Sequence, residues 1–173
     1  WRISAVEDFG SDASKKFYSD VYGMYVTLTA FMASALLVIN KPLSGFLFSK
    51  DFYQAWQYVP VLLAASVIHA YCEFFGTLYT SAMKTKMLFY STVIGAMTNI
   101  ILNFLMIPPM GALGAAIATM TSYLVVWLVR MIHSSKIMKL EYHYFDDVVC
   151  FVLVLIQVVI ASVTVEYEIL KIG

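Results

Sequence analysis

NIILNFLMIPPMGALGAAIATMTS, residues 99–122, consists of two apolar runs separated by a double proline and a glycine. We expect the first run to form a helix that ends at Pro108 and Pro109, because proline lacks the amide donor and crowds the preceding turn. The second run begins after Gly111 with small residues at three- and four-residue spacing, among them Gly114. Small residues let helix backbones approach closely inside a membrane, where packing drives association. The stretch therefore predicts a tight hairpin between two membrane helices.

The composition of the whole chain is that of an integral membrane protein. Of its 173 residues, 61% are hydrophobic and 13% are charged, and the mean hydropathy is +0.80. Soluble domains carry about 45–50% apolar and about 25% charged residues, so this chain falls in the membrane class. The net charge is zero and the sequence has no basic patch interleaved with aromatic residues, so we expect no nucleic-acid partner. Both cysteines, Cys72 and Cys150, lie in apolar runs and are expected to be buried small hydrophobes.

Apolar runs long enough to cross the hydrocarbon predict an all-α fold with about five transmembrane helices. Lys41 and Pro42 are expected to end the first helix, and Pro60 falls in the first turn of the second. Because the chain begins with Trp1 rather than methionine, we expect it to be a piece of a longer protein. The predicted spans are 21–40, 56–81, 87–107, 112–132 and 148–165.

The predicted bundle, 21–165, is flanked and interrupted by segments of different character. Residues 1–20 are polar and mixed in charge, and Ser11 or Asp12 could cap a helix that lies along the cytoplasmic membrane surface. A solvated linker is the alternative for this segment. Residues 43–55 are rich in aromatic side chains, which favours a short helix at the membrane interface, and residues 166–173 form a short tail.

Positively charged residues are distributed unevenly between the two ends of five such spans. The positive-inside rule therefore places the N-terminus in the cytoplasm and the 108–111 hairpin outside. The richer end has Arg2, Lys15, Lys16, Lys84, Lys86, Arg130, Lys136 and Lys139, and the other end has Lys41, Lys50 and Lys171.

Ionisable and amide side chains within the spans are the candidates for a transport pathway. Glu73 and His69 lie one turn apart on one face of the second span. A carboxylate near the bilayer interior costs about 2.5–3.5 kcal/mol on insertion scales, so it normally faces a cavity, a partner or water. Asn99 and Asn103 share a face of the third span with Thr92, and such amides either bind sugar hydroxyls or link helices. For each of these residues the alternative is a structural contact between neighbouring helices.

Lys84, Lys86 and Arg130 are expected to cluster at the cytoplasmic interface, where cations attract anionic headgroups. The alternative is that these charges only set the topology. The sequence contains no nucleotide-binding loop, nucleophile elbow or zinc-binding motif, so we expect neither an enzyme nor a metal site.

Three stretches, in this order along the chain, resemble the polysaccharide-exporter family of O-antigen and oligosaccharide flippases. This family belongs to the superfamily that also includes multidrug and toxin extrusion transporters. Members of this family have about twelve helices in two halves of about six. The resemblance therefore implies that this chain is most of the second half. The stretches are FSKDFYQAWQYVPVLL at 48–63, SAMKTKM at 81–87 and NFLMIPPMGALGAAIAT at 103–119, and the resemblance covers roughly Pro42 to Arg130.

The resemblance implies that the chain helps to flip a lipid-linked oligosaccharide across a bacterial cytoplasmic membrane for surface polysaccharide synthesis. Its partners would then be this substrate, membrane lipids and the remaining helices of the transporter. Lys84, Lys86 and Arg130 would meet the pyrophosphate of the lipid carrier, and no cofactor is expected beyond a proton or sodium gradient. The alternative in the same superfamily is an ion-coupled multidrug antiporter with Glu73 as the coupling acid. A membrane glycosyltransferase would need an acid or arginine constellation in an external loop, which the sequence lacks, and a purely structural membrane subunit is a further alternative.

Overall fold

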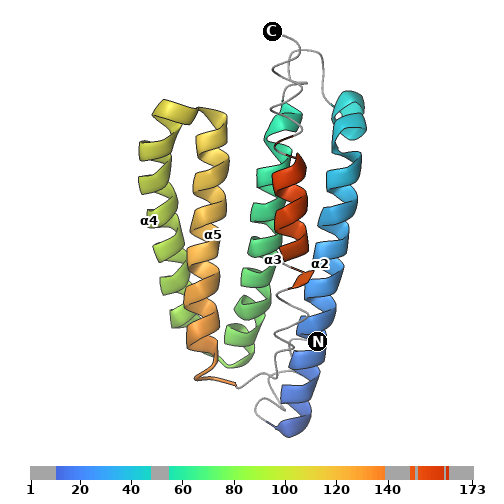
Figure 1. Ribbon diagram of the computed structural model, residues 1–173. Helices are drawn as coiled ribbons and strands as arrows, with labels where there is room; N and C mark the ends of the chain where they lie inside the picture. Colours follow the sequence, from blue (N-terminus) through green and yellow to red (C-terminus); the bar gives the residue numbers. More distant parts are fainter. Residues whose placement is uncertain (1–10, 48–54, 139–148, 151, 162, 164–173) are drawn as a thin grey trace.

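The computed structural model describes residues 11–47, 55–138, 149–150, 152–161 and 163, which form a bundle of long helices (Figure 1). Each of the four long helices is long and apolar enough to cross a membrane. This confirms the all-α membrane fold expected from the sequence. The helices are α2 (Asp12–Leu47), α3 (Val59–Ser81), α4 (Thr85–Met110) and α5 (Ala112–Ser134).

The predicted fifth span, 148–165, is described only in part. Its described residues are helical and include the apolar segment Val152–Ala161. Val154 and Val158 of this segment are buried in the hydrophobic core. The predicted tail 166–173 and the start of the N-terminal segment, 1–10, lie outside the described residues.

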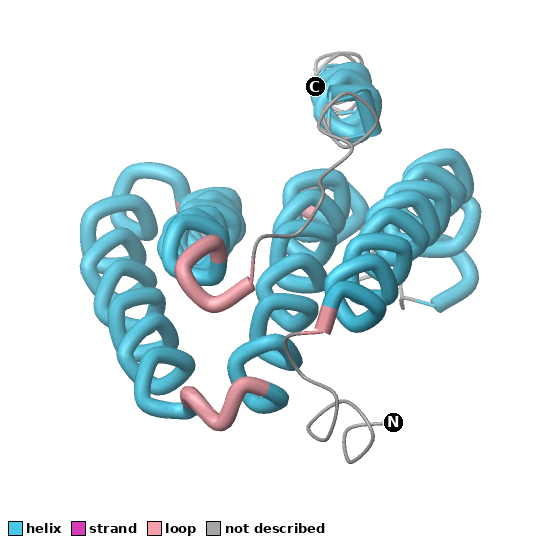
Figure 2. The backbone as a smooth tube through the Cα atoms, turned by 90° about the horizontal axis from the view of Figure 1, so that it is seen from below, coloured by secondary structure: helices cyan, strands magenta, loops and turns pink. Residues whose placement is uncertain are grey.

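The long helices pack in the order α4, α5, α3, α2, so that α3 and α5 form the middle of the bundle (Figure 1). Seen along the bundle axis, the four long helices lie side by side, and the C-terminal helical segment lies on one side of them (Figure 2). Aromatic side chains join α2 to α3, since the rings of Tyr22 and Tyr25 lie 4.9 and 6.3 Å from the ring of Phe74. Phe75 and Leu78 of α3 are fully buried beside them.

The helix α2 begins and ends beyond the span predicted for it. Ser11 caps it as expected, because its hydroxyl oxygen accepts the amide hydrogen of Ser14 at 3.1 Å. The helix then runs without a break from the predicted surface segment into the membrane span. The prediction that it ends at Lys41 and Pro42 is wrong, because α2 continues to Leu47.

Contacts of Asn40 and Lys41 hold the turn of α2 next to Pro42. Proline removes one backbone hydrogen bond, but its φ suits a helix, and such helices persist in membranes when neighbouring groups compensate. Here the buried amide of Asn40 donates to the backbone carbonyl of Trp56 at 3.0 Å and accepts from the hydroxyl of Ser44 at 3.3 Å. The Lys41 ammonium lies 5.4 Å from the centre of the Trp56 ring.

The segment 43–55, predicted as a separate interfacial helix, is joined to α2 at its start. Its first part, up to Leu47, belongs to α2, and residues 48–54 lie outside the described residues. After a short turn, α3 begins at Val59 with Pro60 in its first turn, as predicted.

The α4–α5 hairpin forms as predicted, but the two prolines do not end α4. Pro108 and Pro109 lie in its last turn, and α4 continues to Met110. The fixed φ of proline suits this turn, which the amide of Gly111 closes by donating to the carbonyl of Ile107 at 2.8 Å. The chain reverses at Gly111, whose φ of +57° and ψ of −132° are open to glycine but strained for other residues.

Glycines bring the backbone of α4 against α5. A Cβ atom at Gly114 would overlap the backbone carbonyl of Met106, and one at Gly95 would overlap a methyl group of Val126. The close approach predicted from the small residues at the start of α5 is therefore confirmed.

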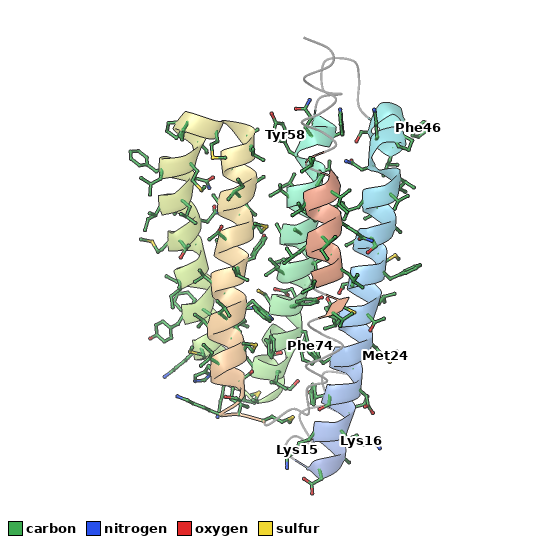
Figure 3. All side chains as sticks on the ribbon, in the orientation of Figure 1. Lys15, Lys16, Met24, Phe46, Tyr58 and Phe74 are labelled. Atoms are coloured by element: carbon green, nitrogen blue, oxygen red, sulfur yellow. The ribbon has the colours of Figure 1, made fainter. Side chains whose placement is uncertain are left out.

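Lysines gather at one end of the bundle. Lys15 and Lys16, near the start of α2, lie at the end opposite Phe46 and Tyr58 (Figure 3). The α3–α4 turn and the end of α5 lie at the lysine-rich end too, which adds Lys84, Lys86 and Lys136 (Figure 1). Among the described residues this end thus holds most of the lysines, and Arg2, Lys50, Lys139 and Lys171 lie outside the described residues. Which end faces the cytoplasm stays a prediction.

Candidate functional site

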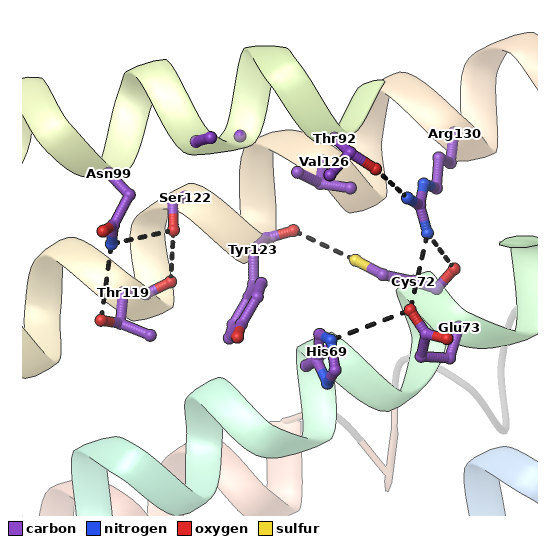
Figure 4. A pocket seen from close by; sticks show the side chains of 12 residues that line it. His69, Cys72, Glu73, Thr92, Asn99, Thr119, Ser122, Tyr123, Val126 and Arg130 are labelled. Carbon is purple, nitrogen blue, oxygen red and sulfur yellow. Dashed lines mark hydrogen bonds and ion pairs between the residues drawn. The ribbon is translucent and has the colours of Figure 1, made fainter. Parts of the chain in front are cut away.

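A pocket of about 400 Å³ opens between α3, α4 and α5 within the membrane-spanning segments (Figure 4). Its wall combines charged groups, amides and hydroxyls, although the outward faces of the same helices are apolar. Such a wall is unusual inside a membrane, because polar groups there must find partners or water. The polar side chains that line it include His69, Glu73, Thr92, Asn99, Thr119, Ser122, Tyr123 and Arg130.

Arg130 reaches from α5 to both neighbouring helices. Its Nε donates to the hydroxyl of Ser91 at 3.0 Å and its Nη2 donates to the hydroxyl of Thr92 at 3.0 Å, both on α4. Its Nη1 donates to the backbone carbonyl of Cys72 on α3 at 2.7 Å. The side chain is only 5% exposed, and a charge buried to this extent is tolerated only when hydrogen bonds stabilise it. Arg130 therefore links three helices at one point.

The surrounding residues explain why Arg130 turns inward. A Cβ atom at Gly76 would lie 3.4 Å from Nη1, so a glycine at this position leaves room for the guanidinium. The buried Tyr79 hydroxyl donates to the backbone carbonyl of Arg130 at 3.1 Å and lies 3.1 Å from Nδ1 of His133. Because α5 continues to Ser134, Arg130 lies inside the helix, one turn before its end.

Glu73 and His69 lie together on α3 and face the pocket, as their spacing predicts. The Glu73 carboxylate oxygen Oε1 lies 3.8 Å from Nε2 of His69 and 4.0 Å from Nη1 of Arg130. The His69 ring packs against the ring of Tyr123 on α5, with centroids 4.5 Å apart. The three ionisable groups therefore lie together in the pocket wall (Figure 4).

The two predicted amides differ in their positions. Asn99 lines the pocket, and its amide nitrogen lies 3.5 Å from the hydroxyl of Thr119 and 3.4 Å from that of Ser122, both on α5. Asn103 does not line this pocket and instead donates to the amide oxygen of Asn99 at 2.9 Å. Asn99 thus links α4 to α5 and presents polar atoms to the pocket, whereas Asn103 bonds to Asn99 on the same helix.

The prediction that Arg130 clusters with Lys84 and Lys86 at the interface is wrong. The two lysines are exposed at the α3–α4 turn, whereas Arg130 is buried among hydrogen-bond acceptors on α3 and α4. The reason is that Arg130 lies one turn inside α5, where hydrogen bonds to α3 and α4 hold its side chain within the bundle.

Sequence reasoning missed the hydroxyl residues that complete the site. Ser91 holds Arg130, and Thr119 and Ser122 hold Asn99. The sequence contained one signal for them: the hydroxyl residues of 119–122 directly follow the small residues of the hairpin. It could not be used without knowing which faces of α4 and α5 meet.

Comparison with protein-family models, with curated proteins and with solved structures found no match to this chain. Within the part of the chain that the structure describes, no group of three His, Cys, Asp or Glu side chains could hold a metal ion.

Proposed function

We propose that this chain is part of a transporter that flips a lipid-linked oligosaccharide from the cytoplasmic to the outer leaflet of a bacterial cell membrane. The observation that carries the proposal is the pocket of about 400 Å³ at membrane depth, lined by amide, hydroxyl, carboxylate, imidazole and guanidinium groups. A glycan needs hydrogen-bond partners for its hydroxyls while it crosses, and its lipid tail can stay in the bilayer beside the apolar helix faces. The three stretches that resemble polysaccharide exporters support the glycan as the cargo.

In this proposal the lysine-rich end faces the cytoplasm, in agreement with the positive-inside rule. The pocket is one wall of a larger cavity that the remaining helices of the transporter complete. The chain works as a transporter rather than as an enzyme, without a bound cofactor, and a proton or sodium gradient can drive it.

An ion-coupled multidrug antiporter is the second candidate. It is favoured by the Glu73 carboxylate, which lines the pocket and is 62% exposed, because a coupling acid must be reachable by ions. An antiporter would export drugs in exchange for the ion and would not move a glycolipid.

The proposal is tested by reconstituting the full-length protein in vesicles and measuring the flipping of a fluorescent lipid-linked oligosaccharide. Ala96 lines the pocket, so Ala96→Leu fills part of it and should slow flipping about tenfold, which corresponds to a loss of about 1.4 kcal/mol of binding. Ala35→Leu makes the same change on the exposed face of α2 and should leave flipping unchanged. Gradient-dependent drug efflux without glycolipid flipping would replace this proposal by the antiporter.

A further inference from the structure

The Arg130 guanidinium keeps both its charge and part of its hydrogen-bonding capacity. An arginine side chain has five N–H donors. Three of them donate to neutral acceptors, the hydroxyls of Ser91 and Thr92 and the carbonyl of Cys72. Two N–H groups, one on Nη1 and one on Nη2, make no hydrogen bond to the described residues, and the guanidinium lines the pocket. A planar, charged donor pair of this kind matches an oxyanion.

Among the described residues, Glu73 is the one carboxylate near this donor pair. Its carboxylate makes no hydrogen bond to the Arg130 guanidinium. Its Oε1 lies 4.0 Å from Nη1 of Arg130 and 3.8 Å from Nε2 of His69, both beyond hydrogen-bond distance. The Glu73 side chain is 62% exposed, whereas that of Arg130 is 5% exposed. The cation is therefore fixed by three hydrogen bonds, and the acid beside it can move toward it or away from it.

We propose that Glu73 is an internal competitor for an oxyanion site on Arg130. A ligand oxyanion of the phosphate type takes the two unused N–H donors. The Glu73 carboxylate opposes its binding, because both negative charges compete for the same guanidinium. This inference rests on the proposed function in one respect, since the oxyanion would be the phosphate-bearing end of the lipid-linked cargo. Competition of this kind keeps the empty pocket close to neutral and limits how long the ligand stays.

The competition predicts that removing the carboxylate strengthens anion binding. Two unit charges about 4 Å apart in a partly solvated site interact strongly enough to change an affinity by about tenfold or more. The probe is inorganic pyrophosphate, titrated into the purified full-length protein in detergent. Glu73→Gln, which keeps the size of the side chain, should bind pyrophosphate about tenfold more tightly than wild type. Because the Glu73 side chain is exposed and its carboxylate makes no hydrogen bond to the described residues, the variant should fold normally.

Asp20→Asn is the matched control, because it removes the same charge from an exposed acid on α2, outside this pocket. It should leave pyrophosphate affinity unchanged. A second titration with a polyprenyl pyrophosphate lipid distinguishes a lipid-borne headgroup from a free anion, and a larger effect of Glu73→Gln on the lipid assigns the site to the cargo. Pyrophosphate binding by Glu73→Gln that is equal to or weaker than that of wild type would overturn the proposal. An equal gain in affinity in Asp20→Asn would overturn it too, as would a Glu73→Gln variant that binds neither pyrophosphate nor the lipid.

The flipping assay separates this inference from the proposed function. Glu73→Gln should retain the oxyanion longer and should therefore lose most glycolipid flipping, and most surface-glycan export in cells, at normal protein abundance. Normal flipping by this variant would overturn the competition and leave the flippase function in place. If the wild-type protein flips no glycolipid but Glu73→Gln still binds pyrophosphate more tightly, the proposed function fails and the competition stands.

Discussion

Replacing Gly114 by alanine should destabilise the α4–α5 hairpin, although the same change stabilises most helices. At an exposed helical position, Gly→Ala gains up to about 1 kcal/mol. At Gly114 the new Cβ would overlap the carbonyl carbon and oxygen of Met106 and lie 3.1 Å from the amide nitrogen of Ile107. These are backbone atoms, so no side-chain rotation relieves the overlap and the two helices must move apart. A gap of about 0.5–1 Å forfeits about a quarter to a half of each dispersion contact across the interface.

We therefore expect Gly114→Ala to lower the free energy of unfolding by about 1–3 kcal/mol, the usual range for overpacking. The measurement is thermal unfolding of the purified full-length protein in detergent. Gly23→Ala on α2 is the control, because its Cβ would meet nothing within 4 Å and the variant should unfold at an equal or higher temperature. Gly114→Leu should also reduce the amount of folded protein, whereas Leu124→Ile should not. A midpoint for Gly114→Ala equal to or above that of wild type would refute the close contact.

Three further predictions concern packing, charge and topology. Gly95→Ala should lower the unfolding temperature, and adding Val126→Ala should restore much of the loss, because the new Cβ would overlap the Val126 methyl group; equal effects of the single and double variants would contradict this. Arg130→Gln should destabilise the full-length protein by about 1–3 kcal/mol in the same unfolding assay, since three acceptors on α3 and α4 lose their donor; an unchanged midpoint would contradict this. Thr85 and Met110 are exposed and lie at opposite ends of α4. In a cysteine-free background, single cysteines at these positions should react with an impermeant reagent from opposite sides of the membrane, Met110 from outside. Labelling of both from one side would refute the topology.

Apolar length and small-residue spacing were sufficient to locate most of the helices. A helix in lipid must satisfy its own backbone hydrogen bonds, so a long apolar run has few alternatives to a single spanning helix. This is why the second to fourth predicted spans match α3, α4 and α5 to within a few residues. The local rules for proline failed at Pro42 and Pro109, because contacts around Asn40 and the hairpin closed at Gly111 hold those turns.

What the sequence by itself determined is the membrane class, the α4–α5 hairpin and the shared face of His69 and Glu73, because each depends on residues close together in the chain. Only the tertiary structure decided that Arg130 belongs with them. Arg130 lies on α5, far from Glu73 along the chain, and its environment depends on the faces that α3, α4 and α5 turn toward one another. Those faces are selected by packing at glycines such as Gly95, and contacts of this kind join distant residues that no local pattern relates.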